Sequence, residues 1–397
     1  MAHLFNSLGS NYSFSFAWKA FMLAILPSGK QSLTVLKNGL EKEFNGKAFF
    51  FHKGRDAITY ALKLLKLPEN SKVITQGFTC YAIEEGIREA QCEPVYADID
   101  PLSLNPTIAE LDRVLQKNPE SRAVLIQHTL GFPADIENIK SWCDEHELVL
   151  IEDLAQSYGG KSLKGNELGS FGDVVILSFG RDKILDGITG GCCIIRKKFE
   201  HEAQTLPNIS AKNRVLLLFY PMLTFLIRTF FQIGIGKALH VIGKITGIVT
   251  NPIQNTAAPL SSLDPCFATL VLLQQKNLHK QLEHRKMIAN IYLEELQEFT
   301  PISAEQVKNA SNLRFPLIAP NPATIISSLK KEHIFISDRW YRSAVDCGSL
   351  GCNSVYMKGS CPKAEHLAHT VLNLPTHQYI QIKDAKIIAQ KVKQCLT

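Results

Sequence analysis

A carboxylate and a lysine occur in order between residues 148 and 183, each next to an apolar run. The run 148–151 leads into Asp153, and the run 173–177 leads through Ser178 to Lys183. A lysine amine can form an imine with an aldehyde, and a carboxylate can pair with a protonated pyridine nitrogen. Pyridoxal 5'-phosphate chemistry needs these two side chains most. We therefore expect Lys183 and Asp153 to be catalytic and to contact this cofactor, although either alone could be a surface lysine or a helix cap.

The phosphate of such a cofactor needs N–H groups at the start of a helix together with a hydroxyl or a cation. The tetrapeptide Lys53-Gly54-Arg55-Asp56 provides a glycine-led entry into an expected helix, and Ser178 provides a hydroxyl. We expect Gly54, Arg55, Asp56 and Ser178 to be cofactor-binding residues. An arginine at the start of a helix can also simply face solvent.

Three kinds of side chain could contact the rest of the cofactor. An aromatic ring should cover the pyridine face, and Phe78 and Tyr81 are the two candidates, between which the sequence does not choose. Gln156 is expected to hydrogen-bond the phenolic oxygen. His128 either orients cofactor or substrate or is a structural histidine of a loop.

The elements that must position these residues alternate between helical and strand patterns. The expected helices are 56–65, 82–90, 107–116 and 136–145, and the expected strands are 72–75, 94–97, 123–126, 148–151, 173–177 and 192–195. Alternation of this kind predicts an α/β domain with a parallel sheet covered on both faces. Ligands of such sheets bind at the carboxyl ends of the strands. Thr79, His128, Asp153 and Lys183 should therefore gather at one edge.

The rest of the chain predicts a second, smaller unit. Residues 13–26 predict an N-terminal helix with an aromatic face, and 270–296 one long helix. Two strands (313–318 and 334–336), a helix (323–331) and a last helix capped by Asp384 predict a small C-terminal α+β domain. The expected divisions are an N-terminal helical segment (1–50), a large cofactor-binding domain (51–206), a basic apolar insert (207–260) and the C-terminal part (261–397).

Five motifs occur in an order that resembles the DegT/DnrJ-type sugar aminotransferases, which are fold-type I pyridoxal-phosphate enzymes. They are Gly54-Arg55-Asp56-Ala57, Pro94-Val95-Tyr96-Ala97-Asp98-Ile99-Asp100, Glu152-Asp153-Leu154-Ala155-Gln156, Ser178-Phe179 with Lys183, and Val371-Leu372-Asn373-Leu374-Pro375-Thr376-His377. The resemblance implies the fold-type I architecture and transfer of an amino group, from glutamate, to a keto sugar that is usually nucleotide-linked. It also implies a homodimer with shared active sites and a place in cell-envelope or polysaccharide biosynthesis.

The chain departs from the family pattern at three places. The acidic residue that the family has after its lysine is absent from Ile188-Thr189-Gly190-Gly191, and Arg55 replaces a hydroxyl residue. The family's Asn-x-Arg has no clear counterpart, and Asn251 and Asn255 are the only candidates. These differences concern the substrate more than the cofactor. A lysine at position 183, where the sugar dehydratase branch has histidine, favours transamination.

Residues 207–250 match nothing in the family's usual pattern. No acidic residue occurs between Glu202 and Asp264, and the stretch 215–227 is almost wholly apolar. Arg228 would cost about 2.5–3.5 kcal/mol near the centre of a bilayer, so we do not expect a membrane span. Two interpretations stay open: an element on a membrane surface, where basic residues meet anionic lipid, and a buried dimer or substrate-domain element.

Composition restricts the compartment and the partners. The ten cysteines are scattered, and the nearest group, Cys347, Cys352 and Cys361, lacks histidines at metal-ligand spacing, so we expect no metal site. Lys19 interrupts the apolar stretch near the N-terminus, which does not resemble a secretory signal. We expect a cytoplasmic protein, or one peripheral on the cytoplasmic face of a membrane, without nucleic-acid partners. Two rival functions remain: a pyridoxal-phosphate elimination or dehydration enzyme, and a non-catalytic membrane-associated scaffold.

Overall fold

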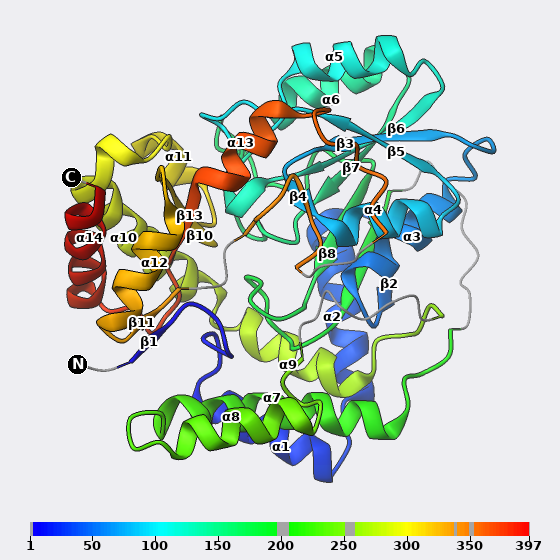
Figure 1. Cartoon of the computed structure of the whole chain (residues 1–397). Helices are drawn as coiled ribbons and strands as arrows, with labels where there is room; N and C mark the ends of the chain where they lie inside the picture. Colours follow the sequence, from blue (N-terminus) through cyan, green and yellow to red (C-terminus); the bar gives the residue numbers. More distant parts are fainter. Residues whose placement is uncertain (1–2, 197–205, 251–258, 337–339, 349–352, 397) are drawn as a thin grey trace.

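A seven-stranded sheet forms the centre of the protein (Figure 1). The computed structural model describes residues 3–196, 206–250, 259–336, 340–348 and 353–396. The strands lie in the order β2-β9-β8-β7-β6-β3-β5, and β9 is antiparallel to both of its neighbours while the others run in parallel. The predicted mostly parallel sheet is confirmed. The strands are β2 (Lys47–Phe51), β3 (Lys72–Gln76), β5 (Glu93–Ala97), β6 (Ser121–Gln127), β7 (Val149–Asp153), β8 (Val174–Ser178) and β9 (Gly191–Ile195).

Helices cover both faces of this sheet, which explains why its strands are almost continuously apolar. On one face α3 (Gly54–Leu64) and α4 (Tyr81–Glu89) bury alternate strand residues such as Leu125 and Cys193. On the other face α2 (Lys30–Phe44), α5 (Ile108–Lys117) and α6 (Ile136–Glu145) bury the intervening residues, such as Ile126 and Cys192. The adjacent residues Cys192 and Cys193 thus pack as small apolar residues on opposite faces of the sheet.

The C-terminal part forms a smaller α+β unit around the antiparallel pair β10 (Arg314–Ile318) and β13 (Val371–Pro375). Two short parallel pairs connect it with the rest of the chain. β1 (Leu4–Phe5) pairs with β11 (Ile334–Phe335), and β4 (Thr79–Cys80) pairs with β12 (Val345–Asp346). Its helices are α10 (Leu278–Leu296), α11 (Ala304–Asn309), α12 (Pro322–Lys331), α13 (Pro362–Thr370) and α14 (Ile382–Leu396), and the 3-10 turns of the chain are η1 (Thr129–Gly131) and η2 (Gln297–Phe299).

Two expectations for the C-terminal part were wrong. The single helix 270–296 is two helices, α9 (Pro265–Gln275) and α10, because α9 packs on α2 in the large domain whereas α10 packs on α14 in the small one. Asp384 does not cap α14 from outside. It lies in the first turn, where its Oδ2 accepts a hydrogen bond from the Gln381 N–H at 3.0 Å.

Three helices form an outer layer at the lower edge of the molecule in Figure 1: α1 (Phe14–Ile25), α7 (Ala211–Thr229) and α8 (Ile235–Ile245). The N-terminal helix expected at 13–26 is therefore present, and its Ser13 Oγ accepts a hydrogen bond from the Phe16 N–H at 3.2 Å. The basic apolar segment provides α7 and α8. None of the described helices has the length and hydrophobicity needed to cross a lipid bilayer.

Candidate active site

Asp153 and Lys183 lie at the same edge of the sheet, as predicted. Asp153 is the last residue of β7, and Lys183 follows β8, the neighbouring parallel strand. Asp153 is 2% exposed, and its Oδ1 accepts a hydrogen bond from the Ala155 N–H at 2.9 Å. Burial raises the pKa of Asp153, and the nearby charge of Lys183 opposes this rise. Burial also lowers the pKa of Lys183, and the nearby Cys80 and Asp153 oppose this decrease. The acid and the amine therefore share one enclosed environment.

Two aromatic residues that the sequence did not indicate close this environment. The Lys183 Nζ lies 4.8 Å from the centroid of the Trp340 ring. Trp340 stacks on Tyr341, with ring centroids 6.3 Å apart and an interplanar angle of 14°. The only sequence signal for this pair was that two aromatic residues stand together in a polar loop of the C-terminal part.

Tyr341 connects two amide side chains of the site. Its Oη accepts a hydrogen bond from the Gln127 Nε2 at 3.3 Å and another from the Gln156 Nε2. The Oε1 of Gln156 accepts from the Leu130 N–H at 2.7 Å, so the orientation of this amide is fixed from both ends. Its expected contact with a phenolic oxygen stays a prediction.

The two aromatic candidates differ in their surroundings. Phe78 is fully buried in the core of the small domain, and its ring meets Tyr341 edge to face at 5.2 Å. Tyr81 begins α4, and its charged neighbours are on α3 and α4. Because Trp340 stands over the Lys183 amine, it is a third candidate for the ring that covers the pyridine.

The start of α3 provides an anion site of the expected kind. Its N-cap residue, Lys53, supplies no side-chain hydrogen bond, so this residue leaves the N–H groups of the first turn uncapped. Gly54 packs closely against the end of β8, because a Cβ atom at position 54 would lie 2.9 Å from the Ser178 Oγ. A Cβ on Gly191 would lie 2.6 Å from the Gly54 Cα. Gly54 and Ser178 are therefore neighbours, and Lys53 is a cation of the site that the sequence reasoning did not single out.

Arg55 and Asp56 have partners within the protein. Arg55 forms an ion pair with Glu85 of α4. Burial raises the pKa of Asp56 to about 6, although Lys53 and Arg55 oppose the rise, and its carboxyl bonds the Lys53 backbone N–H. Their contribution to cofactor binding stays a prediction.

His128 has a structural role. It is fully buried, its Nδ1 accepts a hydrogen bond from the Ala134 N–H at 3.1 Å, and its Nε2 lies 3.3 Å from the Glu152 Oε1. Because Nδ1 accepts, we assign the proton to Nε2, which donates to Glu152. Both ring nitrogens thus bond within the fold, which favours the structural alternative over contact with cofactor or substrate.

The loop that carries Lys183 is built around a buried carboxylate, Asp186. Its Oδ1 accepts from the Tyr12 hydroxyl at 2.6 Å, and its Oδ2 from the Asp182 N–H at 2.8 Å and the Asn11 Nδ2 at 3.2 Å. Asn11 also donates to the Lys183 carbonyl at 3.1 Å. Burial, with a contribution from Asp182, raises the pKa of Asp186 to about 7. No sequence pattern indicated this residue, because its side-chain partners come from the N-terminal segment.

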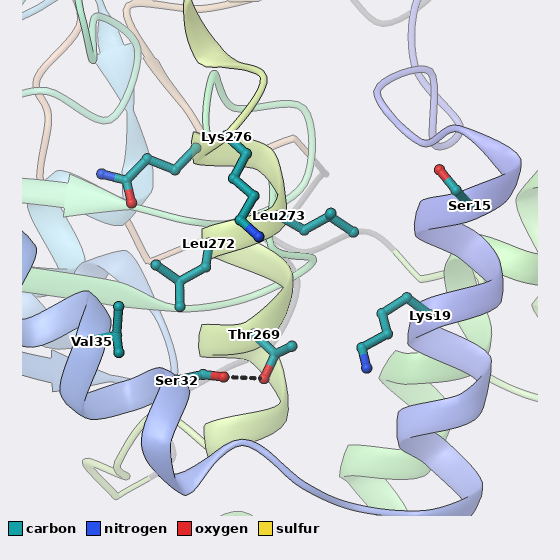
Figure 2. A pocket seen from close by; sticks show the side chains of 9 residues that line it. Ser15, Lys19, Ser32, Val35, Thr269, Leu272, Leu273 and Lys276 are labelled. Atoms are coloured by element: carbon teal, nitrogen blue, oxygen red, sulfur yellow. Dashed lines mark hydrogen bonds between the residues drawn. The ribbon is translucent and has the colours of Figure 1, made fainter.

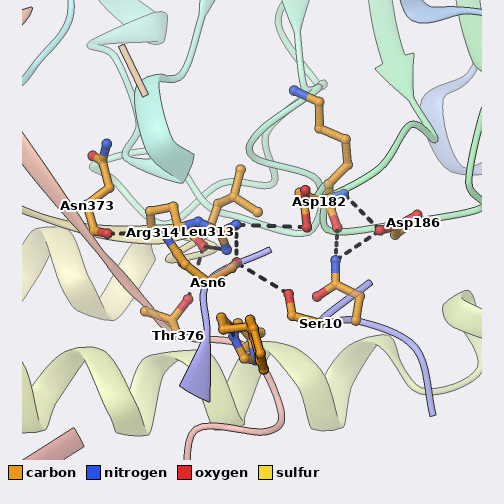
Figure 3. A network of polar contacts seen from close by, with 12 residues as sticks. Asn6, Ser10, Asp182, Asp186, Leu313, Arg314, Asn373 and Thr376 are labelled. Carbon is orange, nitrogen blue, oxygen red and sulfur yellow. Dashed lines mark hydrogen bonds and ion pairs between the residues drawn. The ribbon is translucent and has the colours of Figure 1, made fainter. Parts of the chain in front are cut away.

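Two buried arginines of the small domain, Arg314 and Arg285, extend this network, and Figure 3 shows Arg314 next to Asp182 and Asn6. The Arg314 Nη2 donates to the Asn6 carbonyl at 2.8 Å and lies 4.0 Å from the Asp182 Oδ1. The Arg285 Nη2 donates to the Asn11 Oδ1 at 3.0 Å. The lysine loop is therefore fixed by the N-terminal segment and by the small domain together.

A pocket of about 620 Å³ lies elsewhere, between α1, α2 and α9 (Figure 2). It shares no residue with the edge where Lys183 lies. Its lining is Ser15, Lys19, Ser32, Val35, Thr269, Leu272, Leu273, Gln275 and Lys276.

Over the described part of the chain, no group of three or more acidic, histidine or cysteine side chains could hold a metal ion. Asn251, Asn255 and Cys352 lie outside the described residues. Among the cysteines that the structure describes, eight are free thiols and Cys347 is disulfide-bonded.

The residues at this edge fit pyridoxal phosphate. A buried carboxylate suits a pyridinium nitrogen, an amine with a lowered pKa suits an aldehyde carbon, and the uncapped start of α3 beside Ser178 suits a phosphate. Asp153, Lys183, Gly54 and Ser178 are thus brought together as the sequence predicted.

We expect the substitution Gly54→Ala to weaken cofactor binding roughly 5- to 160-fold, because overpacking costs about 1–3 kcal/mol and here displaces Ser178 from the start of α3. Gly180→Ala is the matched control, since its Cβ would lie 3.5 Å from the same Ser178 Oγ, an ordinary contact. Titration of the apo variants with pyridoxal phosphate measures the affinity. Equal affinities in the two variants would show that Gly54 is not part of the phosphate site.

A family model described as the DegT/DnrJ/EryC1/StrS aminotransferase family matches residues 43–217 and 235–393. The match excludes only 218–234 from the middle of the chain. The expectation that all of 207–250 lies outside the family pattern is therefore too broad.

Individual proteins agree with this match. The "Pleiotropic regulatory protein" of Geobacillus stearothermophilus is 24% identical over 346 residues, which are 86% of this chain and 82% of that protein. The UDP-N-acetyl-3-dehydro-alpha-D-glucosamine 3-aminotransferase of Acidithiobacillus ferrooxidans is 32% identical over 168 residues, 41% of this chain and 45% of that protein. A solved aminotransferase of the matched family from Brucella abortus superposes with a TM-score of 0.70 at 20% identity, over 96% of this chain and 95% of that one. At that identity the likeness shows the fold.

Proposed function

The chain belongs to the DegT/DnrJ/EryC1/StrS aminotransferase family, whose members depend on pyridoxal phosphate, and from this premise we propose that it transfers an amino group to a keto sugar. The observation that carries the proposal is the buried pair Asp153 and Lys183 at the ends of neighbouring parallel strands. A scaffold without catalytic function would have no need of this pair.

Each site residue has a defined task in this proposal. Asp153 would hold the pyridinium nitrogen, Gln156 the phenolic oxygen, and Ser178 with the first turn of α3 the phosphate. When bound, the cofactor would supply an electron sink for the carbon of the amino donor that loses its proton. Lys183 moves that proton, because burial lowers the pKa of its amine and so increases the fraction that can accept one at neutral pH. Trp340 and Tyr341 exclude water from the amine.

We propose glutamate as the amino donor and a nucleotide-linked keto sugar as the acceptor, within cell-envelope or polysaccharide biosynthesis. The support is family membership and the name of the Acidithiobacillus relative, which is an aminotransferase of a UDP-linked keto sugar. The partly exposed Lys53 and the buried Arg285 and Arg314 are cations compatible with anionic substrates.

The donor can be tested on the purified protein loaded with pyridoxal phosphate. We expect L-glutamate, but not D-glutamate, to bleach the visible absorption band and leave the pyridoxamine form, because the donor gives up its amino group without an acceptor present. If the visible absorption band persists in L-glutamate, the proposal that glutamate is the amino donor is contradicted. If the loaded protein instead converts a hydroxylated keto sugar with loss of water and without transfer of an amino group, the elimination or dehydration enzyme is the better description.

We further propose that the protein is a cytoplasmic homodimer. Family membership supports the dimer, and the excess of free thiols over the one disulfide-bonded residue, Cys347, among the described cysteines suits a reducing compartment. The basic apolar segment 207–250 is proposed to contact the cytoplasmic face of a membrane peripherally.

A further inference from the structure

The exposed large apolar side chains of this protein are concentrated in its outer helical layer. Within the described residues, eighteen large hydrophobic residues are exposed, and ten of them lie in the stretches 14–26 and 230–245. They are Phe14, Trp18, Ile25, Leu26, Phe230, Ile233, Ile235, Val241, Ile242 and Ile245. A concentration of this kind marks an interaction surface rather than the scattered exposure of single apolar residues.

The two stretches are joined by α7, on which both α1 and α8 pack. The Phe14 ring lies 5.4 Å from that of Phe225, and the Phe21 ring 5.4 Å from that of Phe219. On the other side, α8 approaches α7 through Gly243, where a Cβ would lie 2.8 Å from Leu223. The three helices therefore lie side by side and form one layer at the lower edge of the molecule in Figure 1.

The two flanking helices have the pattern of helices that lie in a membrane surface. Along α8, residues 238, 241, 242 and 245 are exposed at helical spacing, while Gly236 and Gly243 are buried. Lys237 and Lys244 stand at the border of this apolar stripe. Along α1, the stripe consists of Phe14, Trp18, Phe21 and Ile25. Tryptophan beside an apolar stripe is typical of a membrane–water interface.

The charge of the layer has one sign. Residues 1–40 and 203–263 contain no aspartate or glutamate, whereas at the chain-wide frequency of 37 acids in 397 residues these 101 residues would carry about nine. They carry eight lysines and arginines, which exceeds the net charge of +6 of the whole chain. Five of the eight are exposed: Lys19, Lys30, Lys212, Lys237 and Lys244. The pocket beside α1 adds Lys276 to Lys19 on its walls (Figure 2).

We propose that the layer of α1, α7 and α8 docks on the surface of an anionic lipid bilayer. An apolar stripe enters the headgroup region, and lysines at its border meet lipid phosphates. None of the helices in the described ranges can span the bilayer, so the layer lies along it. A second copy of the chain is a less suitable occupant, because pairing two such layers would bring their lysines together without any acid to neutralise them. This docking extends the membrane contact proposed above for 207–250 by adding α1 and specifying anionic lipid, and it does not depend on the transamination.

Vesicle sedimentation with the full chain tests this docking. We expect binding to vesicles of phosphatidylcholine with phosphatidylglycerol, weak binding to phosphatidylcholine alone, and release by salt. The variants Val241→Asp with Ile245→Asp, and Lys237→Glu with Lys244→Glu, should each bind at least tenfold more weakly. Met357→Asp is the control, because Met357 is also exposed but lies outside the layer. All these variants should keep the cofactor band.

Trp18 provides a second readout. It is exposed, whereas Trp142 is buried and Trp340 is not exposed, so brominated lipid should quench mainly Trp18. Quenching that disappears in Trp18→Phe would support docking through α1. The proposal is overturned if wild-type protein ignores anionic vesicles, or if the layer variants bind them as tightly as Met357→Asp does. It is also overturned if light scattering shows that the layer variants convert a dimer into monomers, since the layer would then be an interface between copies.

Discussion

Replacing Lys183 with alanine should abolish transamination while leaving the fold intact. Proton transfer by a positioned side chain contributes about 100- to 10,000-fold, so kcat should fall by at least this much. The visible band of the lysine-bound cofactor should also be absent, because no other amine is assigned to that position. The two measurements are an absorbance spectrum and a steady-state assay with glutamate and a keto-sugar acceptor.

The matched control is Lys164→Ala, which removes an exposed lysine from a turn between β7 and β8. It should change neither the spectrum nor kcat. Full activity in Lys183→Ala would mean that another group performs the proton transfer, and the site would have to be reassigned.

The substitution Asp153→Asn should have the next largest effect. It keeps the shape and an oxygen for the Ala155 N–H, but removes the charge that would pair with the pyridinium nitrogen. Breaking a buried pair costs about 3–5 kcal/mol, which corresponds to a decrease in kcat of roughly 100- to 5,000-fold. Asp144→Asn, at an exposed position of α6, is the control and should be neutral.

The pH dependence of the free energy of unfolding distinguishes this loss of activity from a folding defect. Burial raises the pKa of Asp153 in the folded protein, so the folded state holds the proton more tightly than the unfolded chain. The cofactor-free protein should therefore lose stability as pH rises from the ordinary aspartate pKa toward the raised one. The asparagine variant should lack this loss. A variant that is both inactive and less stable at neutral pH would indicate a structural role for Asp153 instead.

The sequence predicted the large domain well because the spacing of apolar residues along each helix and strand depends on which of its side chains are buried. Strands covered on both faces must be apolar throughout, and parallel strands place their ends at one edge. The position of Asp153 beside Lys183 follows from these two facts alone. The contact of Gly54 with Ser178 follows as well, once α3 is known to begin at the same edge.

The remaining site residues depend on contacts that no local pattern contains. Trp340 lies beside Lys183, and Tyr341 bonds Gln127 and Gln156. The nearby pairing of β12 with β4 joins only two residues of each strand and is too short to leave a recognisable sequence signal. Asp186 is likewise defined by partners from the start of the chain. The break between α9 and α10 was missed for a related reason: the apolar pattern continues through it, but its two halves face different cores.

The N-terminal segment has a consequence for how the protein is made. The Phe5 carbonyl, in β1, accepts a hydrogen bond from the His377 Nε2, 372 positions later in the chain, and Tyr12 and Asn11 fix Asp186. At a synthesis rate of about 5–20 residues per second, the first residues wait roughly 20–70 s for this partner to be translated. The contacts that hold the N-terminal segment beside the lysine loop are therefore completed only after residue 377 has been synthesised, and a chain released before that point would lack an assembled catalytic edge.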